Sequence, residues 1–133
     1  MNPLLFVYGS LLAAAGHPKG ARLREEALLV GPASIAGRLY RVSWYPAVRP
    51  AERADDRVHG EVYRLADPER ALCWLDEYEG ITPGVQSVAA ADAYERAERD
   101  VRLANGDTRA AWVYLYRRAL PEDGLIASGR WHG

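Results

Sequence analysis

Residues 4–12 read "LLFVYGSLL", and this stretch decides how the fold begins. Its first five residues are apolar or aromatic and lie between a proline and a glycine, which predicts a short buried strand over residues 4–8. A glycine directly after a buried strand lets the backbone turn, and successive N–H groups in such a turn can hold a carboxylate or an oxyanion. The candidate ligand-binding residues here are Tyr8, Gly9, Ser10 and Leu11.

Two other interpretations of this turn stay open. An ordinary strand-ending turn has the same Gly-Ser composition and needs no ligand. A covalent hydrolase or acyltransferase would use Ser10 as its nucleophile, but the G-x-S-x-G pattern is absent and no base neighbours Ser10 in the chain. We therefore interpret Ser10 as a turn former or a ligand-binding hydroxyl. The lysine and the glycine spacing of a phosphate-binding loop are also missing.

Length and composition predict one globular domain that spans residues 1–133. Seventeen basic and eighteen acidic residues give a formal charge of −1, which argues against nucleic acid or an anionic membrane as a partner. The single cysteine, Cys73, cannot form an internal disulfide, and we interpret it as a small buried hydrophobe. The N-terminal apolar run lacks the basic residues of a secretory signal, so we expect a cytoplasmic protein. The sequence does not indicate an oligomeric state.

The clearest helix is predicted after residue 67. Asp67 is a good N-cap and Pro68 suits the first helical position, because its missing N–H would be unbonded there in any case. Leu72, Leu75 and Tyr78 recur at helical spacing, and Gly80 is placed to end the helix. Residues 21–29 suit either a short helix or an extended connection.

The remaining patterns are those of strands. Residues 33–48 have strand-type composition, with a bend or bulge expected at Gly37 and an end at Pro46 and Pro50. Residues 58–65 alternate as a strand does, and residues 94–103 and 108–118 flank "ANGD", which predicts a hairpin with a type I′ turn. Residues 81–93 read as irregular. Hairpin-paired strands with one or two helices predict an α+β fold with a small, curved, mostly antiparallel, barrel-like sheet.

Acidic residues crowd the predicted C-terminal end of the helix in "LDEYEG", residues 75–80. Asp76 and Glu77 can point to water at little cost, whereas Glu79, beside the terminating glycine, is best placed to turn into a cleft. Like-charged neighbours, the helix dipole and partial burial would each raise its pKa, which suits a general base near neutral pH. A solvated acidic helix end is the alternative interpretation.

The aromatic residues Tyr94, Trp112, Tyr114 and Tyr116 are expected mainly in the core. A tyrosine at the rim of a cleft would also be able to bond a substrate or orient the glutamate. His17 and His59 receive no functional role, and three scattered histidines do not predict a metal site.

Six segments in order resemble the γ-glutamylcyclotransferase-like superfamily, which includes the AIG2-like and γ-glutamylamine cyclotransferase proteins. They are "FVYGSLL", "GRLYRVSWYPAV", "VHGEVYRL", "LDEYEG", "YERAERDVRL" and "AWVYLY", and the tail "LIASGRWHG" is also similar. The resemblance implies a barrel-like sheet with a pocket at one side. It implies that Tyr8, Gly9, Ser10 and Leu11 grip a γ-glutamyl group through backbone amides, and that Glu79 is the catalytic glutamate. Tyr94 and Tyr114 resemble family aromatics near the pocket.

The function that this resemblance implies is a cyclotransferase that needs no cofactor and no metal. It would convert a γ-glutamyl amine or a γ-glutamyl amino acid, as its small-molecule partner, to 5-oxoproline and a free amine. A binding module that holds a small carboxylated ligand without turnover is the main alternative, and a serine enzyme that uses Ser10 is the other.

Overall fold

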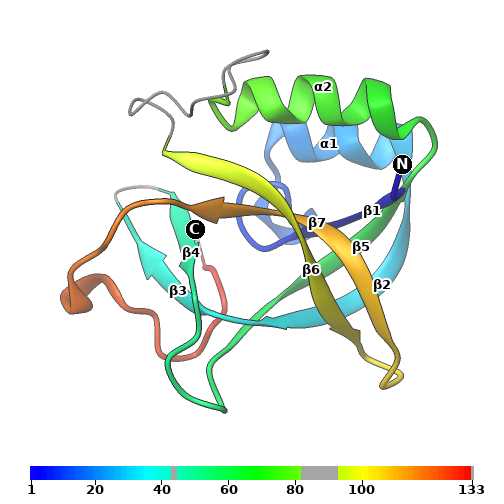
Figure 1. Cartoon of the computed structure of the whole chain (residues 1–133). Helices are drawn as coiled ribbons and strands as arrows, with labels where there is room; N and C mark the ends of the chain where they lie inside the picture. Colours follow the sequence, from blue (N-terminus) through cyan, green and yellow to red (C-terminus); the bar gives the residue numbers. More distant parts are fainter. Residues whose placement is uncertain (43–44, 82–92, 133) are drawn as a thin grey trace.

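The centre of the fold is a closed five-stranded barrel (Figure 1). The computed structural model describes residues 1–42, 45–81 and 93–132. The strand order is β1-β5-β2-β6-β7, and the barrel closes where β7 pairs with β1 in parallel, while the other pairs are antiparallel. The predicted α+β class with a mostly antiparallel, barrel-like sheet is confirmed. The barrel strands are β1 (Leu4–Val7), β2 (Ala27–Ala36), β5 (Arg57–Leu65), β6 (Tyr94–Leu103) and β7 (Thr108–Tyr116).

A second, two-stranded sheet projects from one end of the barrel and consists of β3 (Arg38–Arg41) and β4 (Pro46–Arg49). The chain passes from the barrel into this sheet at Gly37, where the sequence predicts a bend. The expectation that Pro46 ends a strand is wrong, because Pro46 is the first residue of β4. A proline is tolerated there, since a strand's first residue need not donate to the ladder.

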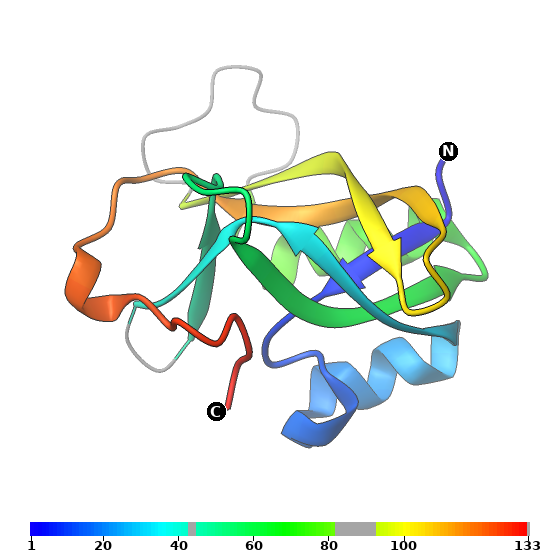
Figure 2. The same cartoon turned by 90° about the horizontal axis from the view of Figure 1, so that it is seen from below.

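Two helices lie together on one side of the barrel (Figures 1 and 2). In α2 (Pro68–Tyr78) the Asp67 carboxylate accepts from the Arg70 N–H at 3.3 Å, which confirms the predicted cap. The stretch that the sequence left undecided divides into α1 (Pro18–Glu26) and the start of β2. The indole of Trp74 joins the two helices, since it donates to Glu26 at 3.0 Å. Neither helix, within the described chain, is long and apolar enough to cross a membrane.

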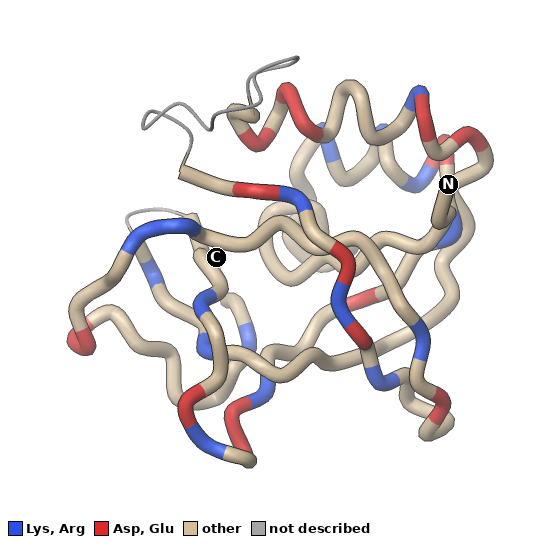
Figure 3. The backbone as a smooth tube through the Cα atoms, in the orientation of Figure 1, with Lys and Arg blue, Asp and Glu red and all other residues tan. Residues whose placement is uncertain are grey.

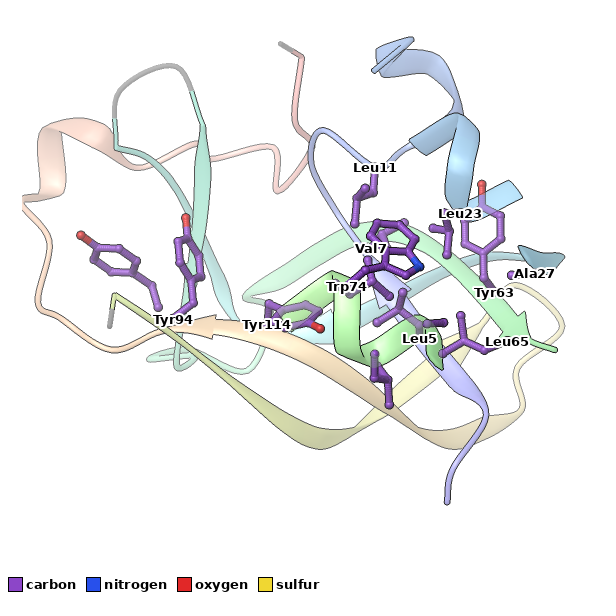
Figure 4. Close-up of a cluster of buried hydrophobic side chains, with 14 of the residues drawn as sticks. Leu5, Val7, Leu11, Leu23, Ala27, Tyr63, Leu65, Trp74, Tyr94 and Tyr114 are labelled. Atoms are coloured by element: carbon purple, nitrogen blue, oxygen red, sulfur yellow. The ribbon is translucent and has the colours of Figure 1, made fainter. Parts of the chain in front are cut away.

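Strand alternation divides the core into two clusters. Leu5 and Val7 of β1 face the helices (Figure 4), in one cluster with Leu72 and Leu75 of α2. Phe6 and side chains from all the other barrel strands fill the barrel interior, among them Ile35, Val58, Val62, Val101 and Val113. Cys73 is exposed, whereas its neighbours Leu72 and Trp74 are buried, so its interpretation as a buried hydrophobe is wrong.

The β6–β7 hairpin forms as predicted, but not with the predicted turn. A type I′ turn requires positive φ at both central residues, and Asn105 does not have it. Instead the Gly106 N–H donates to the Leu103 carbonyl at 2.9 Å, and Gly106 alone takes a positive φ, of 93°. The Leu103 N–H also donates to the Asp107 carbonyl at 2.8 Å, so the loop closed by this bond contains three residues, 104–106. A 3₁₀ turn in the segment before the first helix (Ala13–Ala15) and another in the tail (Glu122–Gly124) complete the described elements.

Candidate functional site

A cavity of about 220 Å³ opens between the end of β1, the start of β4 and the C-terminal end of α2. Tyrosines of β6 and β7 form part of its wall. The parallel closure of β7 on β1, with α2 packed over both, brings these distant segments together. All seven residues predicted for the site line this one cavity: Tyr8, Gly9, Ser10, Leu11, Glu79, Tyr94 and Tyr114.

The turn after β1 supplies backbone donors to the cavity. It is closed by the Leu12 N–H, which donates to the Gly9 carbonyl at 3.0 Å. The N–H groups of Ser10 and Leu11 have no acceptor among the residues that the structure describes. A glycine is required at position 9 for space and not for φ, because a Cβ there would lie 2.5 Å from Cγ of Pro46. The turn thus brings β4 against the loop and leaves two N–H groups available.

The end of α2 fixes the position of Glu79. The Gly80 N–H donates to the Glu77 carbonyl at 3.1 Å, and the Ile81 N–H donates to the Asp76 carbonyl at 2.9 Å. This pair of bonds, with Gly80 at a φ of 79°, is a Schellman motif. Glu79 is the C-cap residue of this motif and still has helical φ and ψ. Its backbone is therefore held rigidly where its side chain meets the cavity.

The carboxyl group of Glu79 is unusual for an acidic helix end. Burial, and then the nearby charge of Asp76, raise its pKa from the ordinary value of 4.5 to about 7. Among the described residues it has no hydrogen-bond partner and no ion pair, and no other charged side chain lines the cavity. A desolvated, uncommitted carboxylate that titrates near neutral pH can accept a proton and return it. The interpretation of this residue as part of a solvated helix end does not fit this geometry.

Four tyrosines surround this carboxylate, and its charge contributes to raising the pKa of each of them: Tyr8, Tyr78, Tyr94 and Tyr114. Three of their hydroxyls donate to the protein itself. Tyr8 donates to the Tyr114 carbonyl at 2.6 Å, and Tyr94 donates to the Pro46 carbonyl at 2.7 Å. The Tyr114 hydroxyl bonds the Asp76 carboxylate at 2.6 Å. These rings therefore shape the wall, while no tyrosine hydroxyl bonds Glu79 within the described chain.

Ser10 has a partner that does not suit a nucleophile. Its Oγ lies 2.7 Å from the Tyr78 hydroxyl. Burial is the main cause that raises the pKa of Tyr78, so that hydroxyl stays protonated and cannot act as a base at neutral pH. No histidine bonds Ser10 among the described residues; His17 instead caps α1, where its Nδ1 accepts from the Lys19 N–H at 3.0 Å. Among the described residues, no base is hydrogen-bonded to Ser10, as the serine-enzyme alternative would require.

Asp76 is the residue that sequence reasoning misjudged. It does not simply point to water: Arg96 of β6 donates to both of its carboxylate oxygens, at 2.8 and 3.1 Å, and Tyr114 bonds the same group. Asp76 precedes Glu79 by three residues, so the two share one face of α2, and this spacing was the available signal. The pairing of Asp76 with Arg96 of β6 is decided only by the tertiary structure. Within the described residues, no group of three or more His, Cys, Asp or Glu side chains is arranged to hold a metal ion.

Comparisons with known proteins identify the family of this chain. The family profile described as "Gamma-glutamyl cyclotransferase, AIG2-like" matches residues 5–133. The chain is 34% identical over 128 residues to the γ-glutamylcyclotransferase family protein ytfP of Citrobacter rodentium, covering 96% of this chain and 93% of that protein. It is 35% identical over 130 residues to YtfP of Escherichia coli K12, covering 96% and 94% of the two chains.

Solved structures show the same fold. An AIG2-like protein from Mus musculus superposes with a TM-score of 0.73 at 22% identity, covering 98% of this chain and 88% of that one. YkqA from Bacillus subtilis superposes with a TM-score of 0.70 at 24% identity over 98% of this chain, which spans 40% of that longer chain. The family match over nearly the whole length, together with the barrel and its glutamate-containing pocket, shows that this chain belongs to the γ-glutamyl cyclotransferase, AIG2-like family.

Proposed function

We propose that this protein is a cyclotransferase that converts a γ-glutamyl amine, or a γ-glutamyl amino acid, to 5-oxoproline and a free amine. Glu79 is the general acid and base of the reaction. The observation that carries this proposal is the Glu79 carboxyl group, which has a pKa of about 7, no partner among the described residues, and a place in the same cavity as the turn after β1.

The reaction is an intramolecular aminolysis. Glu79 removes a proton from the substrate's α-ammonium group, and the free amine attacks the γ-carbonyl carbon to close a five-membered ring. The new C–N bond forms, the bond to the leaving nitrogen breaks, and Glu79 returns its proton to that nitrogen. No electron is gained or lost, and the carboxyl group ends as it began. The nucleophile already belongs to the same molecule, so folding the substrate into an attack geometry is a large contribution to rate.

The turn after β1 has the donors that such a reaction needs. The uncommitted N–H groups of Ser10 and Leu11 would hold the substrate's carboxylate or the oxyanion that develops on the γ-carbonyl. One donor of this kind typically contributes about 2.7–4 kcal/mol to transition-state stabilisation. The tyrosine wall around Glu79 keeps the site poor in polar groups, which strengthens each of these interactions.

A substrate panel tests the proposal. Wild type and Glu79→Gln are incubated with several γ-glutamyl amines and γ-glutamyl amino acids, and 5-oxoproline is measured by mass spectrometry. We expect turnover by wild type and a loss of about 10²–10⁴-fold in Glu79→Gln, the usual contribution of a general acid–base. Glu77→Gln is the matched control, because it removes the same charge from an exposed neighbouring residue.

The panel also separates the alternatives. Ligand binding without any 5-oxoproline would support the binding module. An acyl-enzyme mass on Ser10 would support the serine mechanism. Activity retained in Glu79→Gln would refute Glu79 as the base.

A further inference from the structure

We propose that Asp76 and Arg96 are positioning residues for Glu79. Their ion pair anchors the Tyr114 side chain in the cavity wall. It also places the negative charge of Asp76, partly neutralised by Arg96, one helical turn from Glu79. This inference rests on the proposed function, because it assigns the pair a role in the same site. Neither residue lines the cavity, so both act through Tyr114 and Glu79.

The ion pair has a defined two-point geometry and is largely shielded from solvent. Arg96 Nε and Nη2 donate to the two Asp76 oxygens at 2.8 and 3.1 Å, and the two side chains are only 21% and 24% exposed. Bidentate pairs of this kind fix direction as well as distance. The guanidinium carbon also lies 4.5 Å from the ring centroid of Trp112, a cation–π contact that further restricts the Arg96 side chain.

The β6–β7 ladder explains why Arg96 reaches this point. Arg96 is directly opposite Tyr114 in the register, so their side chains project from the same face of the barrel toward α2. Strand β6 has charged side chains of both signs along its length (Figure 3). Of its cations, Arg96 forms the ion pair with Asp76 of α2. The Asp76 carboxylate therefore accepts hydrogen bonds from both the Tyr114 hydroxyl and the Arg96 guanidinium.

This arrangement controls the charge that Glu79 experiences. Within the described part of the chain, Asp76 is the charged group that raises the pKa of Glu79. The tyrosines whose pKa values respond to the charge of Glu79 are Tyr8 after β1, Tyr78 of α2, Tyr94 of β6 and Tyr114 of β7, and Tyr45 also lines the cavity. The four tyrosines that respond to Glu79 stay neutral, since burial is the first cause that raises the pKa of each. Among the described residues, the Asp76–Arg96 pair is thus the charged neighbour of Glu79 that a substitution can change.

Two substitutions should move the protonation midpoint of Glu79 in opposite directions. Asp76→Asn removes the negative neighbour and leaves Arg96 uncompensated, and both effects stabilise ionised Glu79, so its midpoint falls. Arg96→Met leaves Asp76 uncompensated, so the midpoint rises. For charges about one helical turn apart and partly screened, we expect a shift of about one pH unit in each case. Damage to the fold would not produce shifts of opposite sign.

The experiment is a carboxyl ¹³C NMR titration of the protein labelled at glutamate side chains, with the Glu79 signal assigned by its loss in Glu79→Gln. Glu77→Gln and Arg99→Met are matched controls, because each removes a like charge from an exposed position on the same element. Arg96→Lys should bring the midpoint back toward wild type, since it keeps the cation. The pH profile of kcat/KM should move in parallel with the NMR midpoint.

The outcomes distinguish this inference from the proposed function. Shifts in the same direction, or no shift in either variant, would overturn the positioning role even if the enzyme is active. Opposite shifts in a protein that forms no 5-oxoproline would support the electrostatic role and reject the proposed activity. If Arg96→Met fails to fold, the Glu79 midpoint in Asp76→Asn is compared with that in Glu77→Gln. A midpoint that does not move in Asp76→Asn contradicts the inference.

Discussion

The raised pKa of Glu79 makes a prediction about stability that does not depend on any substrate. A carboxyl group whose pKa is higher in the folded protein than in the unfolded chain binds its proton more tightly when folded. Wild type should therefore lose stability as the pH rises from about 4.5 through about 7. A pKa difference of about 2.5, at 1.36 kcal/mol for each pH unit, amounts to about 3 kcal/mol.

Glu79→Gln removes this loss, because the amide does not ionise. The free energy of unfolding of the variant relative to wild type should increase by about 2.5 kcal/mol between about pH 5 and about pH 8.5. Urea denaturation of both proteins at the two pH values measures this change, and the comparison across pH cancels any pH-independent effect of the substitution.

The matched control is Glu77→Gln, which removes an exposed carboxylate from the same helix end. Its stability should follow that of wild type at both pH values. If Glu79→Gln also follows wild type, the Glu79 carboxyl group is solvated, and its assignment as a desolvated base is refuted.

Three further predictions concern the cavity. The pH profile of kcat/KM should have an acidic limb with a midpoint near 7, because Glu79 must be ionised to accept a proton; a midpoint near 4.5 would show an unperturbed carboxylate. Gly9→Ala should cost about 1–3 kcal/mol in urea denaturation and lower activity, since its Cβ would lie 2.5 Å from Cγ of Pro46; unchanged stability would contradict that close approach. In a comparison of kcat/KM, substrates that release an amine without a carboxylate should react faster than γ-glutamyl amino acids. A carboxylate on the leaving group would need a cation beside it, but no described lining residue is basic, and residues 43–44 and 82–92 contain no lysine or arginine. The reverse preference would contradict this.

Local signals predicted most of the elements correctly. The Asp67-Pro68 start and Gly80 end of α2 are properties of the adjacent backbone, so a short window of sequence contains them. Alternation likewise predicted β5, with Val58 and Val62 on one face and Tyr63 on the other. The errors also have local causes. The Asn-Gly pair suits more than one hairpin turn, and a proline is compatible with either the end or the first residue of a strand.

The candidate site was predicted partly from residues and partly from family resemblance. A glycine after a strand and a glutamate before a helix-ending glycine are visible in the sequence, as is the spacing that places Asp76 and Glu79 on one helix face. The turn after β1 was expected to need glycine for its conformation, whereas its real constraint is the approach of Pro46. The stretch over residues 81–93 was expected to be irregular, and residues 82–92 of it lie outside the described part of the chain.

The sequence by itself determined α2 with its two ends, β1, β5, the β6–β7 hairpin and the two acidic side chains on one face of α2, because these depend on neighbours within a few residues. Only the tertiary structure decided that β7 closes on β1, that Arg96 rather than water meets Asp76, and that Glu79 lies in a cavity with no partner among the described residues. Charge compensation and desolvation depend on groups from distant parts of the chain. The pKa that makes Glu79 a candidate base is therefore a property of the packed barrel and helix, and not of the sequence "LDEYEG".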